Sequence, residues 1–270
     1  MTPEFICPVC RHRLLRSEQS LSCNNNHSFD LAREGYVNLL TGKALGPLVG
    51  DSSEMVRARQ AFLGKGFFEP LAKSIPPSWV NQQPNSILDM GCGEGYYLRV
   101  LIQSFVTARK YGIDISKAAI SAAAKSTPGA SFAVSDINRL IPLPDGSIDA
   151  AIGVFSPRNA SEFARVIRPG GDLTIVVPGQ DHLAAVRNRF GLLSIQAEKA
   201  AKVEGQLADF KLREGKTLEL ALTLSNDDIR NLIKMMPSAR HMTPEKWTAV
   251  ENTDEMSVEA RFEMLSFIRK

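Results

Sequence analysis

The sequence predicts an α/β fold: a mostly parallel sheet covered by helices on both faces, with a small metal-binding module in front of it. Short apolar strands alternate with helical segments between residues 86 and 178, which is typical of parallel sheets with crossover helices. Three cysteines and a histidine cluster within residues 7–27. The chain of 270 residues, 44% of them hydrophobic, is long enough for a full core and a second module.

Net charge, the length of the apolar runs and the position of the cysteines indicate which kind of protein this is. A net charge of +3 is compatible with nucleic-acid binding but does not argue for it. No apolar run approaches the roughly 18 residues that span a bilayer, and residues 1–17 lack the apolar region of a signal peptide. We therefore expect a cytoplasmic protein without a membrane partner. In that reducing compartment, clustered cysteines indicate metal binding rather than disulfides.

The first elements follow from capping residues and turn formers. Residues 41–53 contain three glycines and a proline and predict a mobile loop. Two serines then precede a helix over 54–66, which two glycines close, and a second short helix covers 68–75 before a pair of prolines.

The sheet elements come next. The pattern predicts strands at 86–90, 110–115, 131–137, 149–155 and 172–178, and helices at 96–105, 117–126 and 161–167. Two further strands, 217–224 and 257–270, have no clear crossover helix after the last of them and could pair antiparallel. The chain therefore divides into a metal-binding module (1–36), a linker and helical segment (37–80) and a sheet domain (81–270).

The module carries four candidate metal ligands, Cys7, Cys10, Cys23 and His27. Two ligands separated by two residues form a tight knuckle, and a second pair closes a tetrahedral site suited to structural zinc. Coincidental buried cysteines are the alternative, and His12 is a competing ligand. Arginines in the connecting loop could touch RNA, but residues 1–36 hold four basic and four acidic residues, so a purely structural platform stays open.

A candidate nucleotide site follows the first strand of the domain. Gly91, Gly93 and Gly95 stand at alternate positions, and Asp89 precedes them, where it can accept from an ammonium group and would repel a pyrophosphate. Asp114 ends the next strand, suited to accept both hydroxyls of a ribose. Asp136 follows the third strand, near where an adenine ring would lie.

This pattern, an acid before three alternating glycines and another acid at the next strand end, resembles the class I (Rossmann-like) S-adenosylmethionine-dependent methyltransferases over roughly residues 80–270. The resemblance implies a seven-stranded sheet with an antiparallel final strand, and S-adenosylmethionine as methyl donor.

Three longer segments are more specific: HSFDLAREGYVNLL with the CPxC before it, GDSSEMVRARQAFLGKGFFEPL, and LDMGCGEGYY. Together they resemble the bacterial 23S ribosomal RNA guanine-N1 methyltransferases, which include tylosin-resistance enzymes. The family implies zinc at the four ligands above and donor contacts from Phe68, Gly93, Glu94 and His182. It often has tyrosine in place of Phe68. It tends to read Met-Thr-Pro followed by tryptophan near the C-terminus, where we read Met235–Arg240 as a departure.

The family implies methylation of N1 of a guanine in an unpaired or flipped-out position, such as a hairpin loop of 23S rRNA. The N1 proton must be removed. Asp136 or a nearby histidine could accept it, but the sequence identifies no base. Phe67, Phe68 and Phe155 could stack on the base, although core packing explains each at least as well. Ser156, Pro157 and Arg158 follow Phe155 at the end of the fourth strand, where the family places substrate-facing residues. Residues 182–216 carry a net +3 and could contact phosphates, or form a solvated helix face.

Two other functions remain open. A methyltransferase acting on a small molecule or a protein would show no salt-sensitive RNA binding. A non-catalytic RNA-binding factor would have a degenerate donor site, against which the intact Asp89, Gly91, Gly93 and Asp114 speak. The metal module could also support a homodimer.

Overall fold

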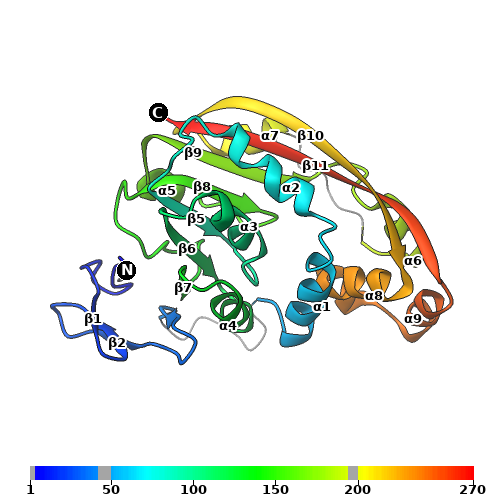
Figure 1. Cartoon of the computed structure of the whole chain (residues 1–270), viewed down its shortest axis with the longest axis horizontal. Coiled ribbons are helices and arrows are strands. Elements are labelled where there is room, and N and C mark those ends of the chain that lie inside the picture. The colour runs from blue at the N-terminus through cyan, green and yellow to red at the C-terminus, as the bar shows by residue number, and fades with distance from the viewer. Residues whose placement is uncertain (1–3, 42–49, 194–199) are drawn as a thin grey trace.

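A mixed sheet forms the centre of the computed structural model, which describes residues 4–41, 50–193 and 200–270 (Figure 1). Within these residues the main sheet has the order β10-β11-β9-β8-β5-β6-β7-β4. Neighbours pair in parallel except β11, which is antiparallel to β9 and β10. The predicted seven-stranded sheet is confirmed, and a short eighth strand extends its edge. The strands are β4 (Val37–Asn38), β5 (Ser86–Met90), β6 (Arg109–Asp114), β7 (Ser131–Val134), β8 (Ile148–Val154), β9 (Ile167–Pro178), β10 (Phe210–Ser225) and β11 (Glu255–Arg269).

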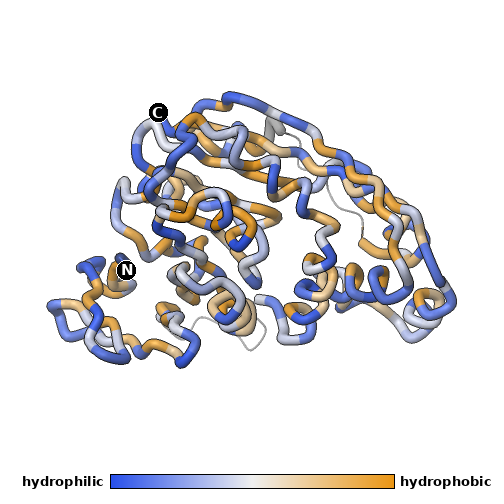
Figure 2. Tube along the Cα trace, viewed as in Figure 1, coloured by the Kyte–Doolittle hydropathy of each residue, from blue (hydrophilic) through white to orange (hydrophobic). Residues whose placement is uncertain are grey.

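The central strands β5 and β8 are buried on both faces. Every residue in them is buried, as expected for apolar strands that helices cover on both sides. Successive side chains point to opposite faces, so Ile87 belongs to one hydrophobic cluster and Leu88 to the other. Figure 2 shows hydrophobic residues concentrated in these inner elements.

The predicted crossover helices are present as α3 (Tyr96–Ser104), α4 (Lys117–Ser126) and α5 (Ala160–Val166). Ser116 and Asn159 cap α4 and α5, each accepting a hydrogen bond from the backbone amide three residues on. The buried side chains of α3 and α4 lie in one cluster and those of α5 in the other. Helices therefore cover both faces of the sheet.

The N-terminal module is a three-stranded antiparallel sheet of β1 (Leu15–Ser17), β2 (Ser20–Ser22) and β3 (Ser28–Asp30). It packs on the main sheet, where the rings of Phe5 and Tyr111 meet edge to face at 5.9 Å. The chain then enters the main sheet as β4, which pairs in parallel with β7. The segment that we expected to be a linker therefore begins as an edge strand.

Two predicted helices follow, α1 (Ser53–Leu63) and α2 (Glu69–Ser74), with a 3-10 turn at Pro76–Ser78. The Ser52 hydroxyl accepts from the Met55 amide at 3.2 Å and caps α1. Residues 42–49 of the predicted loop lie outside the described residues.

A long β10–β11 hairpin extends across the molecule and carries helices at its far end (Figure 1). These are α8 (Asn226–Met235), the 3-10 helix Pro237–His241 and α9 (Pro244–Glu251), while α6 (Ala184–Phe190) and α7 (Ala200–Gln206) precede the hairpin. A solvated helix face was one of two alternatives for residues 182–216, which contain α6 and α7, whereas α8, the 3-10 helix and α9 were not predicted. Helix α8 begins with a capping box formed by Ser225 and Asp228, a sequence signal that could have revealed it. Among the described helices, none is both long and apolar enough to cross a membrane.

Candidate functional site

The structure brings the four predicted metal ligands together. The Sγ atoms of Cys10 and Cys23 are 3.5 Å apart, and Nδ1 of His27 lies 3.4 Å from Cys23 Sγ and 3.6 Å from Cys7 Sγ. All four ligand atoms lie within 4.8 Å of one another. In a tetrahedral site with Zn–S of about 2.3 Å and Zn–N of about 2.0 Å, ligand atoms stand about 3.5–3.8 Å apart. The cluster therefore fits a zinc ion held by three thiolates and one imidazole.

Two tight turns position these ligands. The Cys7 amide donates to the His12 carbonyl at 2.8 Å, and the Cys23 amide donates to the His27 carbonyl at 3.0 Å. The His12 side chain is exposed and is not part of the cluster. Burial opposes ionisation of the Cys23 thiol, but hydrogen bonds from the backbone amides of His27 and Asn25 help to lower its pKa to about 6. A low pKa favours the thiolate, which is the form that binds metal.

The glycine-rich loop, residues 91–95, joins β5 to α3. The amide of Gly91 donates to the carbonyl of Ile113 at 2.8 Å, which ties the loop to β6. Gly91 has a φ of 75°, and a Cβ there would lie 2.5 Å from the Cβ of Ser156. Glycine is therefore required where the loop meets the turn that follows β8.

Three carboxyl groups border this loop, two of them buried and that of Asp114 partly exposed. Asp89 and Glu94 are each 1% exposed, and neither Asp89 Oδ2 nor Glu94 Oε1 has a hydrogen-bond partner among the described residues. Burial, with added repulsion from Asp114 and Glu94, raises the pKa of Asp89 to about 8. Burial also raises the pKa of Glu94 and of Asp114. Buried acceptors without partners, in an acidic cluster, are suited to a cationic ligand.

Asp114 is oriented by two backbone amides. Its Oδ2 accepts from the Gly93 amide at 2.9 Å, and its Oδ1 accepts from the Ser116 amide at 2.8 Å. A carboxylate has about four acceptor positions, so two remain for the hydroxyls of a ribose. The loop and its three acids therefore fit a nucleoside that carries a positively charged tail.

Four rings gather beside the loop: Phe68 at the start of α2, Phe155 after β8, His182 before α6 and Phe262 in β11. The Phe262 ring centre is 5.0 Å from that of Phe68 and 4.9 Å from that of His182. Phe155 lies 5.8 Å from His182, is 44% exposed and has a positive φ of 54°. The next residue, Ser156, touches the glycine-rich loop, so the aromatic group adjoins the acidic one.

The three aromatic residues considered for stacking differ in exposure. Phe68 is 2% exposed and belongs to the core. Phe67 is half-buried against Phe62, with ring centres 4.9 Å apart. Phe155 is the one that presents its ring at the surface.

His182 is held in one tautomer. Its Nδ1 lies 2.8 Å from the carbonyl oxygen of Arg261, and because a carbonyl can only accept, Nδ1 carries the hydrogen. Burial lowers the pKa of His182 to about 4, so the ring is neutral at pH 7. Its Nε2 therefore has a free lone pair.

Asp136 lies apart from both groups, beyond the end of β7. Its Oδ1 accepts from the Asn138 amide at 2.9 Å, and its Oδ2 is 3.6 Å from Arg139 Nε. β5 and β6 separate β7 from β8, which places the ends of β7 and β8 about 14 Å apart at about 4.8 Å per strand. Asp136 lines a cavity of about 240 Å³ between the module and the sheet, together with Pro8, Arg11, Leu39, Leu40, Thr41, Ser135, Arg139 and Leu140.

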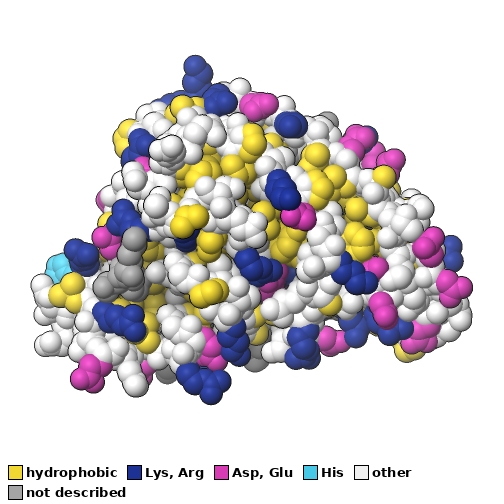
Figure 3. All heavy atoms as spheres, in the orientation of Figure 1, with side chains coloured by type: hydrophobic (Ala, Val, Ile, Leu, Met, Phe, Trp, Pro, Cys, Tyr) yellow, Lys and Arg dark blue, Asp and Glu magenta, His cyan; other side chains and the backbone are white. Residues whose placement is uncertain are grey.

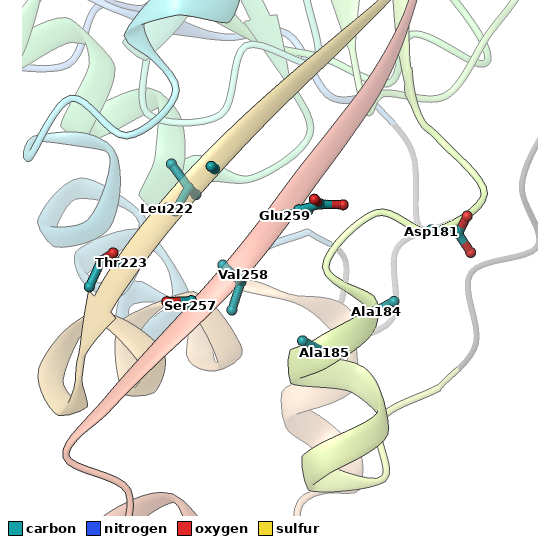
Figure 4. A pocket seen from close by; sticks show the side chains of 9 residues that line it. Asp181, Ala184, Ala185, Leu222, Thr223, Ser257, Val258 and Glu259 are labelled. Atoms are coloured by element: carbon teal, nitrogen blue, oxygen red, sulfur yellow. The ribbon is translucent and has the colours of Figure 1, made fainter.

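A larger cavity of about 460 Å³ lies between α6 and the β10–β11 hairpin (Figure 4). Small and polar side chains such as Asp181, Ser257 and Glu259 line it, and none of the predicted site residues does. The predicted site residues therefore lie outside this cavity.

Two residues at the site were not predicted from the sequence. Arg59 of α1 approaches Gly93, and Phe262 completes the aromatic group. Each comes from a segment distant in sequence from the glycine-rich loop. Ser156, which lies against Gly91, belongs to the segment after β8 where substrate-facing residues were expected.

The departure that we expected at Met235–Arg240 is wrong. The sequence Met-Thr-Pro stands at 242–244, with Trp247 close behind. The earlier Met-Pro pair opens the 3-10 helix, whereas Thr243 caps α9. Trp247 is half-buried, with Lys234 Nζ 5.8 Å from its ring centre.

Comparisons with known proteins match both the Cys/His cluster and the domain that carries the glycine-rich loop. A zinc-ribbon family model described as RlmA, N-terminal, matches residues 5–43, and one described as Methyltransferase domain matches residues 87–171. A chain from the complex between the Haloferax volcanii Trm112 methyltransferase activator and a methyltransferase shares the fold, with a TM-score of 0.54 and 18% identity over 82% of this chain and 99% of that one. Fold and site thus define an S-adenosylmethionine-dependent methyltransferase with a zinc ribbon.

Curated relatives narrow the family. The 23S rRNA (guanine(748)-N(1))-methyltransferase of Streptomyces fradiae is 37% identical over 89% of this chain and 87% of its own length. A protein of Micromonospora griseorubida, named as a 23S rRNA (guanine-N(1)-)-methyltransferase, is 36% identical over 92% of this chain and 91% of its own length. The chain belongs to the family of 23S rRNA (guanine-N1)-methyltransferases.

Proposed function

We propose that this protein transfers a methyl group from S-adenosylmethionine to N1 of a guanine in a hairpin loop of 23S rRNA, in the cytoplasm. The observation that carries the proposal is that one chain holds both the Cys₃His cluster and the acidic glycine-rich loop, and that relatives named for this reaction match it across both parts.

The donor site is proposed at the glycine-rich loop, where Gly91 and Gly93 let the backbone pass beneath the ligand. Asp89 and Glu94 accept from the ammonium group of the donor, directly or through water, and Asp114 accepts from the ribose hydroxyls. Asp136 lies toward the adenine end, because it follows β7, the strand next to β6. When bound, S-adenosylmethionine supplies an electrophilic methyl group on a sulfonium.

The target base is proposed to stack on Phe155, the exposed ring beside the donor loop. A base must leave its stack to reach such a position. Phe68 and His182 border the same space, where the neutral His182 Nε2 can accept a hydrogen bond from guanine N1–H and orient it. Asp136 follows β7, which lies three strands from β8 and therefore from Phe155. The sheet order thus favours a donor-binding role for Asp136 over a role as the base that removes the N1 proton.

The zinc site is proposed to be structural. Cys7, Cys10, Cys23 and His27 supply four protein ligands, which leaves no open position for a reacting water. In a module this small the metal supplies much of the folding free energy. Zinc thus stabilises the fold of the module, from which the chain continues into β4 beside β7.

On the face that Figure 3 draws, the basic side chains of the described residues do not form a single patch. Figure 3 shows Lys and Arg side chains spread along the lower edge of this face, with Asp and Glu among them. Of residues 182–216, for which phosphate contacts and a solvated helix face were both open, 194–199 lie outside the described residues.

The test is methylation of 23S rRNA from a strain that lacks the enzyme. N1-methylguanine blocks base pairing, so we expect one new primer-extension stop in a hairpin loop, dependent on protein and S-adenosylmethionine. No stop in any rRNA, together with methylation of a small molecule or a protein, would contradict the RNA substrate. No binding of S-adenosylmethionine would instead support a non-catalytic factor.

A further inference from the structure

Arg59 reaches the glycine-rich loop from α1. Its Nη1 lies 3.3 Å from the position that a Cβ would take on Gly93. Its Nη2 donates at 3.1 Å to the carbonyl of Met235, the last residue of α8, and Nη1 pairs with Asp51. The side chain is 23% exposed. The guanidinium is therefore held where α1, α8 and the loop meet.

This guanidinium has unused capacity. Arginine has five N–H donors in a planar fork, and the Met235 carbonyl and the Asp51 carboxylate are the acceptors that the described residues supply. Further N–H groups remain for another acceptor, and a carboxylate matches the fork geometry.

The charges around the loop indicate which chemical group the remaining N–H donors of Arg59 would bind. Asp89, Glu94 and Asp114 make the loop acidic, and Arg59 acts against burial to lower the pKa of Glu94 and of Asp114, so it lies within electrostatic reach of both. Arg99 also faces Glu94, but its Nη1 is bonded to Ser126 at 3.0 Å as well as lying 3.4 Å from Glu94 Oε2. Among the described residues, Arg59 is a cation that lies directly against Gly93 of the loop.

The donor's amino-acid tail carries an ammonium and a carboxylate on the same carbon. Acidic side chains suit the ammonium and repel the carboxylate, so the site needs a cation within one tail's width of the acids. We propose that Arg59 binds the carboxylate of the donor's amino-acid tail. This deepens the proposed function and rests on it.

Two ligands isolate the contact. S-adenosylhomocysteine carries the amino-acid tail, whereas 5′-methylthioadenosine has the same nucleoside and sulfur without it. We expect R59Q to weaken S-adenosylhomocysteine binding about 10- to 100-fold, the usual effect of losing a charge-assisted pair, and to change 5′-methylthioadenosine binding less than about twofold. R59K, which keeps the charge but not the fork, should fall between. Calorimetric titration of the full-length protein measures all of these.

R57Q is the matched control, because Arg57 is exposed on the same helix, and it should bind both ligands as the wild type does. Equal losses for both ligands in R59Q and R59K would show that Arg59 only supports the packing of α1 on α8, and would overturn the inference. Unchanged S-adenosylhomocysteine affinity in R59Q would also overturn it. If the wild type bound neither ligand, the proposed function itself would fail.

Discussion

Burial keeps the carboxyl group of Asp89 protonated at neutral pH until a cation binds beside it, because its pKa is about 8 in the folded protein and 3.8 as a free group. Between these pH values the unfolded chain releases a proton that the folded chain retains, so the free energy of unfolding falls as pH rises through this window. D89N has no charge to bury. We expect it to melt several degrees above the wild type at pH 8 and to bind S-adenosylmethionine at least about tenfold more weakly, as thermal unfolding and calorimetry will show. A difference in stability between wild type and D89N that stays constant from pH 5 to 8 would contradict the protonated state.

His182 has the opposite dependence on pH. Burial lowers its pKa from 6.5 to about 4, so the unfolded chain binds the proton first, and stability is complete above pH 6.5 and lost as pH falls toward 4. The titration of His182 should lower the free energy of unfolding by about 2 kcal/mol between pH 7 and pH 5. H182N, which keeps an N–H for the Arg261 carbonyl, should lack that loss. Urea unfolding at both pH values measures it, and equal losses in the two proteins would exclude His182 as the cause.

Single residues were predictable from the sequence where chemistry sets their spacing. Zinc coordination dictates Cys7-x-x-Cys10, and the strand–loop–helix turn dictates where an acid such as Asp89 stands. Arg59 and Phe262 could not be found in this way, because each reaches the site from a different element and its neighbours in the sequence reveal nothing about the contact.

The contact between the glycine-rich loop and the turn after β8 is a property of two elements together. G91A would place its Cβ 2.5 Å from Ser156 and adopt a φ of 75°. We expect a loss of about 2–4 kcal/mol from strain and overpacking, with loss of donor binding. G129A is the matched control, because Gly129 has a φ of 88° but nothing within 4 Å. Denaturant unfolding compares them. Equal losses would show that conformational strain, and not the contact with Ser156, requires glycine in the loop.

The turn after β8 also carries the exposed Phe155 ring. F155A should lower kcat/KM for the RNA hairpin about 5- to 100-fold, the range for loss of one stacked base, and leave S-adenosylmethionine affinity within about twofold. F155Y should restore activity because it keeps the ring. Steady-state kinetics and calorimetry separate the two effects. If F155A lost as much S-adenosylmethionine affinity as kcat/KM for the RNA hairpin, the ring would instead belong to the donor site.

Elements were predictable where hydrophobic periodicity is strong. The central strands and α4 match their expected positions, since apolar runs and a serine cap define them. The helices at the tip of the hairpin were not predicted, because the hydrophobic pattern of the two flanking strands is stronger than theirs. The capping box at Ser225 was a local signal for a helix there.

At the scale of the whole molecule, the zinc ribbon and the glycine-rich loop border the same sheet but belong to different hydrophobic clusters. The Phe5–Tyr111 contact joins the ribbon to the sheet, whereas the donor loop lies at the ends of β5 and β6. We expect chelation of zinc, or C10S, to lower the melting temperature and abolish RNA methylation, with donor affinity changed less than about threefold. Thermal unfolding, calorimetry and methylation assays check this. Retention of full RNA methylation by zinc-free protein would contradict it.

The architecture as a whole followed from the alternation of strands and helices, but its strand order did not. Nothing in residues 210–225 or 255–269 indicates that β11 lies between β9 and β10. That order depends on which strands bury complementary surfaces, which is decided by contacts between distant segments. The resemblance of the donor loop and the zinc ligands to a known family supplied what periodicity could not.

The place of β11 has a consequence for how the chain is made on the ribosome. β10 has β11 as its sheet neighbour, so during translation it has no template until residues 255–269 emerge, and the edge of β9 stays open to wrong pairing until then. The α8 helix, whose last carbonyl holds Arg59, is carried between these two strands and docks with them. A nascent chain can therefore fold its parallel strands early, yet Arg59 gains its hydrogen bond to Met235 only after the hairpin has closed.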